Sequence, residues 1–284
     1  VTGVQTCALP ISERIRGTDL ILSDDDTNGH GTSVCGILNG GVIGKRKFVG
    51  VAPDAELLVS HGTDHTIYIP WARTNGADVM LYEFGNWIQE FMDGSSNLET
   101  MIDAEAAAGI VQVVPAGNLG HKDKHAQADV GAGGSVNFNF NVPSTDNPGT
   151  APDEDIDRVF ITALWRTPGN DVDFDITTPT PSNVNLPADP GDTNWHSTTS
   201  GDGHTIYYRR EDSSRGTAKY DITIERTKVI IGGWTVQAGN SDSDPQHVDM
   251  YIADNRTSWS GGALWTSNQA NENTIDWPAT ADSA

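Results

Sequence analysis

Residues 97–118 read NLETMIDAEAAAGIVQVVPAGN, and this stretch places a helix directly before an apolar strand. The helix is expected to bury one stripe of side chains at helical spacing, formed by Leu98, Met101, Ile102 and Ala106. Gly109 is a typical helix stop. The following run IVQVV has the continuous apolar character of a strand that is covered on both faces. The stretch therefore favours an α/β fold.

The same alternation of helices and strands extends upstream, from about Glu13. The segment TSVCGILNGG (32–41) predicts a short apolar helix that stops at a glycine pair, and residues 56–60 predict a strand after a proline turn. A helix-forming patch at 70–74 precedes the apolar strand in ADVMLYEFG (77–85). These elements predict a doubly wound, mostly parallel sheet, with functional groups at the carboxyl ends of its strands.

The pattern changes near Val130, where apolar and polar residues begin to alternate. In SVNFNFNVP (135–143), valine and phenylalanine occupy one face and asparagine the other, which is the period of a half-buried strand. Six similar runs follow, separated by Gly, Pro, Asp, Asn and Ser. Short strands at this spacing predict an antiparallel β-sandwich or jelly roll, which we expect at about 130–260.

The composition limits the class of function. The 284 residues include 39 acidic and 17 basic side chains, for a formal net charge of −22. This balance leaves no basic surface for a nucleic-acid partner. Two cysteines, Cys7 and Cys35, are too few for a disulfide framework. No apolar run approaches the about 20 residues that cross a bilayer, so no membrane partner is predicted.

A histidine between two glycines, in DTNGHGTSVCG (26–36), is the first candidate catalytic residue. Gly29 and Gly31 leave both flanks of His30 open to other groups, and the apolar helix that follows would hold the ring still. A catalytic base needs this combination of access and rigidity. By itself such a tripeptide is more often a simple turn.

An asparagine just past an apolar strand is the second candidate. In VVPAGN (113–118), Asn118 follows Gly117 and precedes Gly120 by two positions, so its amide can point into a cleft above the sheet. Such an amide can donate a hydrogen bond to a developing oxyanion, which contributes roughly 3 kcal/mol of transition-state stabilisation. The alternative is an ordinary turn asparagine.

The order and content of these segments resemble the subtilisin-like serine peptidases, the subtilase family. The resemblance rests on NGHGTSVCGIL (28–38), GVAPDAELL (50–58), GADVMLYEFG (76–85), VVPAGNLG (113–120) and NTIDWPATADSA (273–284). It covers about 13–119 and 274–284. The sandwich at 130–260 is therefore expected to be an insert in a peptidase domain formed by 13–129 and 261–284.

The resemblance implies roles for individual residues. His30 would be the general base and acid of a Ser-His-Asp triad, and Asn118 the oxyanion-hole donor. A groove for an extended polypeptide substrate would be lined by Tyr82, Glu83, Phe84 and Gly85. The family commonly has Ser where Glu83 stands, which would favour basic or small substrate side chains. Cys35 is expected to be a packed thiol, and the family implies an extracellular location.

Two members of the triad are not found in this sequence. The family's aspartate ends a strand well upstream of the histidine, whereas Asp19 and the run at 24–26 lie too close to His30. The family's serine motif would lie beyond Ala284. Residues 1–12, VTGVQTCALPIS, resemble a translated sequencing adapter. We therefore expect a truncated fragment that is inactive by itself.

Metal and phosphate sites are weaker alternatives. His61 with His65, and His121 with His125, have a spacing of four that would suit zinc on one helical face, but both pairs stand in polar loop sequences. The segment GGVIGKR (40–46) falls one residue short of a phosphate-binding loop. No cofactor is predicted, and calcium at the aspartates of the run DVDFD (171–175) stays possible.

A binding module is the alternative from a different functional class. In this interpretation the sandwich recognises carbohydrate or protein, and the peptidase part is vestigial. Exposed Trp195, Trp234 and Trp259 on one face would favour it, because aromatic platforms suit sugars. Tryptophans packed between the sheets would count against it.

Overall fold

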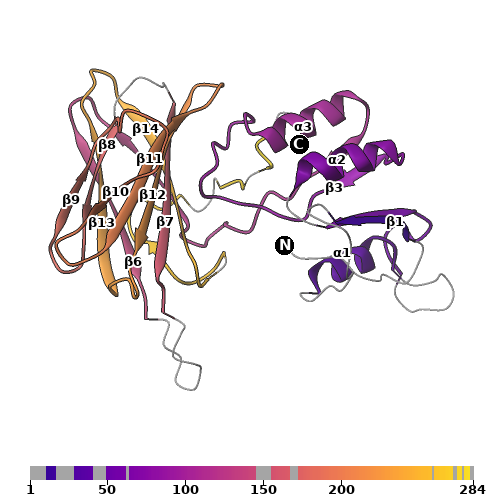
Figure 1. Ribbon diagram of the computed structural model, residues 1–284, viewed down its shortest axis with the longest axis horizontal. Coiled ribbons are helices and arrows are strands. Elements are labelled where there is room, and N and C mark those ends of the chain that lie inside the picture. Colours follow the sequence, from indigo (N-terminus) through magenta and orange to yellow (C-terminus); the bar gives the residue numbers. More distant parts are fainter. Residues whose placement is uncertain are drawn as a thin grey trace. The chain divides into compact units, whose positions relative to one another are not determined.

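The computed structural model describes residues 11–16, 29–40, 49–61, 64–144, 155–166, 172–257, 259–270, 274–276 and 278–281 (Figure 1). The chain divides into two compact units. The first comprises Val1–Phe84, Asn97–Pro115 and Ala281–Ala284, and the second comprises Gly85–Ser96 and Ala116–Thr280. Most of the adapter-like segment and the aspartates at 19 and 24–26 lie outside the described residues.

The described part of the first unit contains the helices α1 (His30–Asn39), α2 (His65–Thr74) and α3 (Asn97–Ala107) (Figure 1). Helix α1 begins after Gly29, whose φ of 79° suits glycine best. Helix α2 starts earlier than the patch predicted at 70–74, because the Asp64 side chain caps it by accepting the Thr66 N–H at 3.0 Å. None of these described helices is long and apolar enough to cross a membrane.

Helix α3 ends as the sequence predicts. Gly109 has a φ of 92° and its N–H donates to Ala106 O at 2.9 Å, while the next N–H, of Ile110, donates to Glu105 O at 3.1 Å. This pattern satisfies the last helical carbonyls and confirms the glycine stop. Of the predicted stripe, Leu98 and Ile102 are buried and the other two members are half-buried.

The strands of the first unit form two parallel pairs. Strand β1 (Ile11–Arg16) pairs with β2 (Leu57–His61), and β3 (Val79–Leu81) pairs with β4 (Val111–Val113). Met80 and Gln112 are buried on one face of the second pair, but the other face exposes 56% of Val79, 37% of Leu81, 56% of Val111 and 43% of Val113. No described strand joins the two pairs, so the described residues do not show the doubly wound sheet that the sequence predicts.

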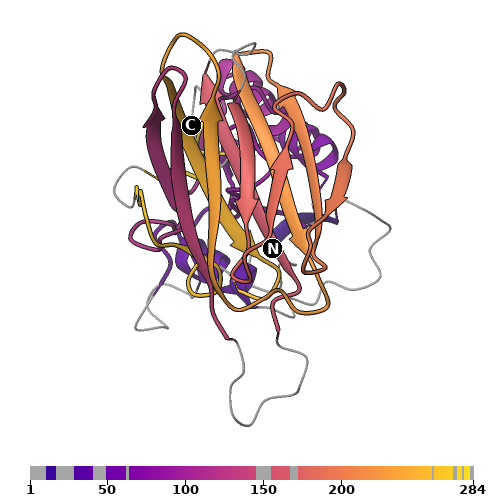
Figure 2. The same cartoon turned by 90° about the vertical axis from the view of Figure 1, so that its left-hand side faces the viewer.

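The second unit is an antiparallel β-sandwich (Figure 2). One sheet has the order β10-β11-β12-β7-β14-β5 and the other β15-β6-β13-β8-β9. The strands are β5 (His125–Val130), β6 (Ser135–Val142), β7 (Arg158–Arg166), β8 (Val172–Thr177), β9 (Asn183–Leu186), β10 (His196–Thr199), β11 (Thr205–Asp212), β12 (Thr217–Glu225), β13 (Gly232–Asn240), β14 (Gln246–Asp254) and β15 (Leu264–Trp265). The seven strands predicted from alternation are present, and β5, β9, β10 and β15 are additional.

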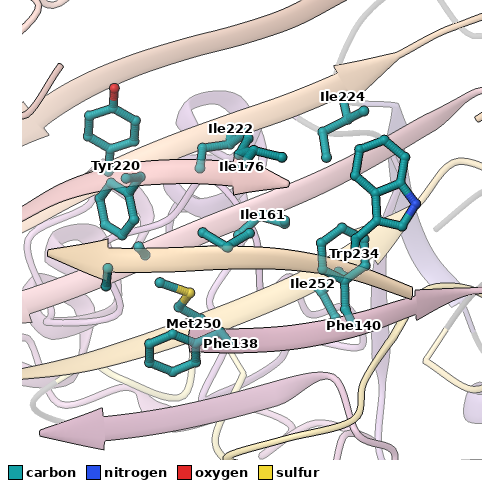
Figure 3. Close-up of a cluster of buried hydrophobic side chains, with 14 of the residues drawn as sticks. Phe138, Phe140, Ile161, Ile176, Tyr220, Ile222, Ile224, Trp234, Met250 and Ile252 are labelled. Carbon is teal, nitrogen blue, oxygen red and sulfur yellow. The ribbon is translucent and has the colours of Figure 1, made fainter. Parts of the chain in front are cut away.

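The core of the sandwich is formed by the apolar faces of both sheets. In β6, Phe138, Phe140 and Val142 are buried while the asparagines between them face outward, which confirms the predicted alternation. Figure 3 shows that Phe138 and Phe140 lie near Met250 and Ile252 of the opposite sheet. Burying large side chains in this way stabilises a fold by about 1.5–3 kcal/mol each.

Strand β12 is buried on both faces, unlike a half-buried strand. Its outward side chains, among them Lys219 and Asp221, lie under the segment Gly85–Ser96, which we name the strap. Lys219 Nζ donates to the Gln89 O at 2.7 Å and lies 4.5 Å from the centre of the Phe91 ring. The Gln89 N–H donates to Thr162 Oγ1 at 2.6 Å. The sheet therefore binds both backbone groups of one strap residue.

Candidate active site

His30 is the first residue of α1, and 43% of its side chain is exposed. Its Nε2 lies 3.3 Å from the backbone O of Glu83 and 3.8 Å from Glu83 Oε2. Behind it, the thiol of Cys35 is buried against Val59, which confirms the prediction of a packed thiol. The histidine thus combines access to solvent with a helix anchored in an apolar cluster.

A cavity of about 810 Å³ opens beside His30 within the first unit. It is lined by residues of α1, β2, α2 and β3, and by Glu83 and Phe84 after the end of β3. A histidine and a carboxylate at the edge of a cavity are chemically suited to proton transfer. The sequence predicts functional groups at the carboxyl ends of strands, and Glu83 lies just after the carboxyl end of β3.

The four predicted groove residues differ in their surroundings. The Tyr82 hydroxyl donates to Gln112 Oε1 at 2.8 Å, and burial raises the pKa of Tyr82 above its usual range. Glu83 and Phe84 are half-buried, and Gly85 is exposed at the start of the strap. The Tyr82 side chain is therefore buried and its N–H donates to Val113 O at 2.9 Å, whereas the Glu83 side chain is accessible.

Asn118 lies in the second unit, in the loop after β4, and its side chain is exposed. The next residue, Leu119, is buried in an apolar cluster with Met92, Leu164 and Tyr251. Gly117, which precedes Asn118, has a φ of 98°. The loop is therefore anchored on one side by apolar packing while the amide stays available as a donor.

Asp276 is a residue that the sequence reasoning missed. Its Oδ2 accepts the Asn118 N–H at 3.4 Å, and its own N–H donates to Ala116 O at 3.0 Å. The residue is only 3% exposed, and Oδ1 has no hydrogen-bond partner among the described residues. Burial raises the pKa of Asp276 to about 6, although the Asn118 N–H partly opposes that rise. The signal available in the sequence was its place in NTIDWPATADSA (273–284), one of the segments that resemble the subtilase family.

The histidine pairs weighed as zinc ligands do not lie on helical faces. His61 ends β2 whereas His65 begins α2. His121 is in a turn, and His125 is in β5 with its Nδ1 3.0 Å from Thr274 Oγ1 and its Nε2 2.8 Å from Asp249 Oδ1. Within the described residues, no group of three or more His, Cys, Asp or Glu side chains is arranged to hold a metal ion.

The three tryptophans do not form the platform that the binding-module alternative requires. Trp234 is buried between the sheets and stacks on Phe140 with ring centres 5.8 Å apart (Figure 3). Trp195 and Trp259 are 42% and 46% exposed, and Arg209 lies over the Trp195 ring at 4.7 Å. The arrangement of Trp234 counts against the carbohydrate-binding alternative.

Comparison with known proteins identifies the family. A family model described as the subtilase family matches residues 16–277, which include His30 and Asn118. The chain belongs to the subtilase family. As a subtilase it is a member of a family of serine peptidases, which act on polypeptides.

Two relatives of this subtilase chain show how far the likeness extends. Subtilisin DY of Bacillus licheniformis is 36% identical over 104 residues, which are 34% of this chain and 36% of the relative. The structure of the Clostridium perfringens CspB protease matches with a TM-score of 0.68 at 18% identity, over 90% of this chain and 54% of that one. The subtilase chain thus spans only part of the length of either protein. Because 90% of it is covered, the shared fold includes the sandwich.

Proposed function

We propose that the chain is the central part of a secreted serine endopeptidase, with His30 as the general base and acid and Asn118 as the oxyanion donor. The observation that carries this proposal is the family match across 16–277, which includes both residues. The surroundings of each residue support it separately. His30 is accessible at the start of an anchored helix, and Asn118 exposes its amide from an anchored loop.

The proposed chemistry divides hydrolysis into two steps. His30 takes the proton of a serine hydroxyl as that oxygen attacks the peptide carbonyl, then gives the proton to the leaving amine. The Asn118 amide donates to the negatively charged carbonyl oxygen of the tetrahedral intermediate. Water then hydrolyses the acyl-enzyme by the same route. In this proposal the serine and the aspartate come from parts of the parent protein outside these 284 residues.

The cavity beside His30 supports a place for the aspartate. Strands β2 and β3 both line the cavity, and each has only one neighbouring strand in the described part of the chain. A further strand between them would join the two parallel pairs into one sheet and would end near His30. We propose that the strand carrying the aspartate occupies this cavity, which would complete the doubly wound sheet.

The substrate is proposed to be an extended polypeptide that pairs with the backbone of residues 82–85. The Glu83 carboxylate is half-exposed beside His30, where it would attract a basic side chain or leave room for a small one. A peptide library cleaved by the parent protein should therefore favour these residues. A preference for acidic residues at the subsite next to Glu83 would contradict this assignment.

The proposal is tested with the parent protein and with the chain itself. Proteolysis of casein by the parent protein should fall by about 10³-fold or more in His30→Ala, because the general base is lost. Asn118→Ala should lower kcat by about 10²–10³-fold with KM nearly unchanged. Residues 1–284 alone should not react with a fluorophosphonate probe. Labelling of that chain would disprove the assignment of the serine to another segment, and full activity of His30→Ala would disprove the mechanism.

A further inference from the structure

The segment around Asp276 holds the Asn118 loop at two points. The Asp276 N–H donates to Ala116 O at 3.0 Å, and its Oδ2 accepts the Asn118 N–H at 3.4 Å. The two residues of the second bond are 158 positions apart in the sequence. One residue on the return from the sandwich therefore binds the backbone on both sides of Gly117.

The carboxyl group also fits closely against the loop. A Cβ built on Gly117 would lie 2.1 Å from Cγ and from Oδ2 of Asp276. Such a distance is far shorter than any van der Waals contact, so the space that glycine leaves is filled by the Asp276 side chain. Position 117 is therefore restricted to glycine both by its φ of 98° and by this carboxyl group.

Burial of this carboxyl group is unfavourable in the absence of a cation. The groups that face it are the backbone N–H of Asn118 from the loop and the side chain of Tyr251 from β14, whose own pKa is raised partly by Asp276. His125 of β5 stacks on Tyr251 at 4.3 Å between ring centres, and its ring nitrogens face Asp249 and Thr274. No basic side chain in the described part of the chain forms an ion pair with Asp276. Titratable groups that are strongly perturbed by burial often belong to functional sites.

We infer that Asp276 is a positioning residue that holds the Asn118 backbone, and thereby directs the amide assigned to the oxyanion. This inference rests on the proposed function of Asn118. Asp276 does not touch the reacting atoms, and it acts through the N–H of Asn118. Protonation of Asp276 weakens it as an acceptor, so the loop is held best when the carboxyl group is ionised.

Amide NMR of the whole chain tests the inference without requiring catalysis. The Asn118 N–H signal should shift with pH around a midpoint near the Asp276 pKa of about 6. The shift should be absent in Asp276→Asn, which keeps an acceptor oxygen but has no charge. Asp244→Asn removes an exposed carboxylate of the same unit and should leave the titration of Asn118 unchanged.

Hydrogen exchange provides a second measurement. Asp276→Ala should speed exchange of the Asn118 N–H about tenfold, as expected for the loss of one hydrogen bond. Should that variant fail to fold, Asp276→Asn alone decides the question. An Asn118 titration that persists in Asp276→Asn would overturn the inference. If the unsubstituted parent protein does not cleave casein, that result would instead count against the peptidase proposal, so the two failures are distinguishable.

Discussion

Replacing Asp276 with asparagine should stabilise the sandwich unit at neutral pH. The pKa of Asp276 rises from 3.8 in the unfolded chain to about 6 in the folded protein. Each unit of pKa corresponds to about 1.4 kcal/mol, so ionisation of this group costs about 3 kcal/mol of folding free energy above pH 6. Asparagine has nearly the same shape and carries no charge.

The sign of the pH dependence follows from the raised pKa. The favourable contribution of the protonated carboxyl group is fully present below pH 3.8 and is lost as pH rises to about 6. The stability advantage of Asp276→Asn should therefore be small at pH 4, grow to at most about 3 kcal/mol near pH 6, and stay constant above it.

Urea unfolding followed by tryptophan fluorescence measures this difference. Trp165, Trp234 and Trp265 are all buried in the sandwich, so the signal reports on the unit that contains Asp276. Wild type and variant are compared at several pH values between 4 and 8, with Asp244→Asn as the control for removing one negative charge from an acidic chain. A stability difference that is the same at pH 4 and pH 7 would refute the assignment of a raised pKa to Asp276.

Three further substitutions test the packing. Gly117→Ala should destabilise the unit by about 2 kcal/mol or more, measured by thermal unfolding, because the methyl group meets the Asp276 carboxyl group and the backbone is left-handed. Lys219→Met should cost about 1–3 kcal/mol and speed proteolytic cleavage of the strap, since it removes the donor to Gln89 O and one cationic partner of buried Asp221 and half-buried Glu211. Lys228→Met, at a half-exposed lysine, should leave that cleavage rate unchanged. Trp234→Ala should lower the urea unfolding free energy by about 3–5 kcal/mol, and a loss below 1 kcal/mol would contradict its place in the core.

Much of the sandwich could be predicted because alternation is a local signal. A strand such as β6 records its buried face in its own sequence, through Phe138 and Phe140. The strands β9 and β10 escaped prediction because each has only four residues, NVNL and HSTT, which is too short to establish a period. The burial of Lys219 was equally invisible, because the covering strap lies more than a hundred residues earlier in the chain.

The candidate site was only partly predictable, because some of its contacts join residues that are far apart in the sequence. His30 and Asn118 stand in motifs with distinctive neighbours, whereas nothing close to Asp276 in sequence indicates that it contacts Asn118. The apolar runs of β3 and β4 predicted strands covered on both faces. In the described residues one face of this pair is exposed. The prediction missed this because the period of a sequence does not show which segments supply the covering layer.

The contact between Ala116 and Asp276 also bears on the entropy of the chain. A segment of more than 150 residues leaves and returns at backbone groups 3.0 Å apart. If it were a flexible loop, closing it would cost roughly 2–3 kcal/mol more than closing a loop of about ten residues. Because the intervening residues fold into a sandwich whose ends are already joined, the sandwich brings residues 116 and 276 together as it folds. The length of the intervening domain then has little effect on the free energy of forming the Asn118 loop.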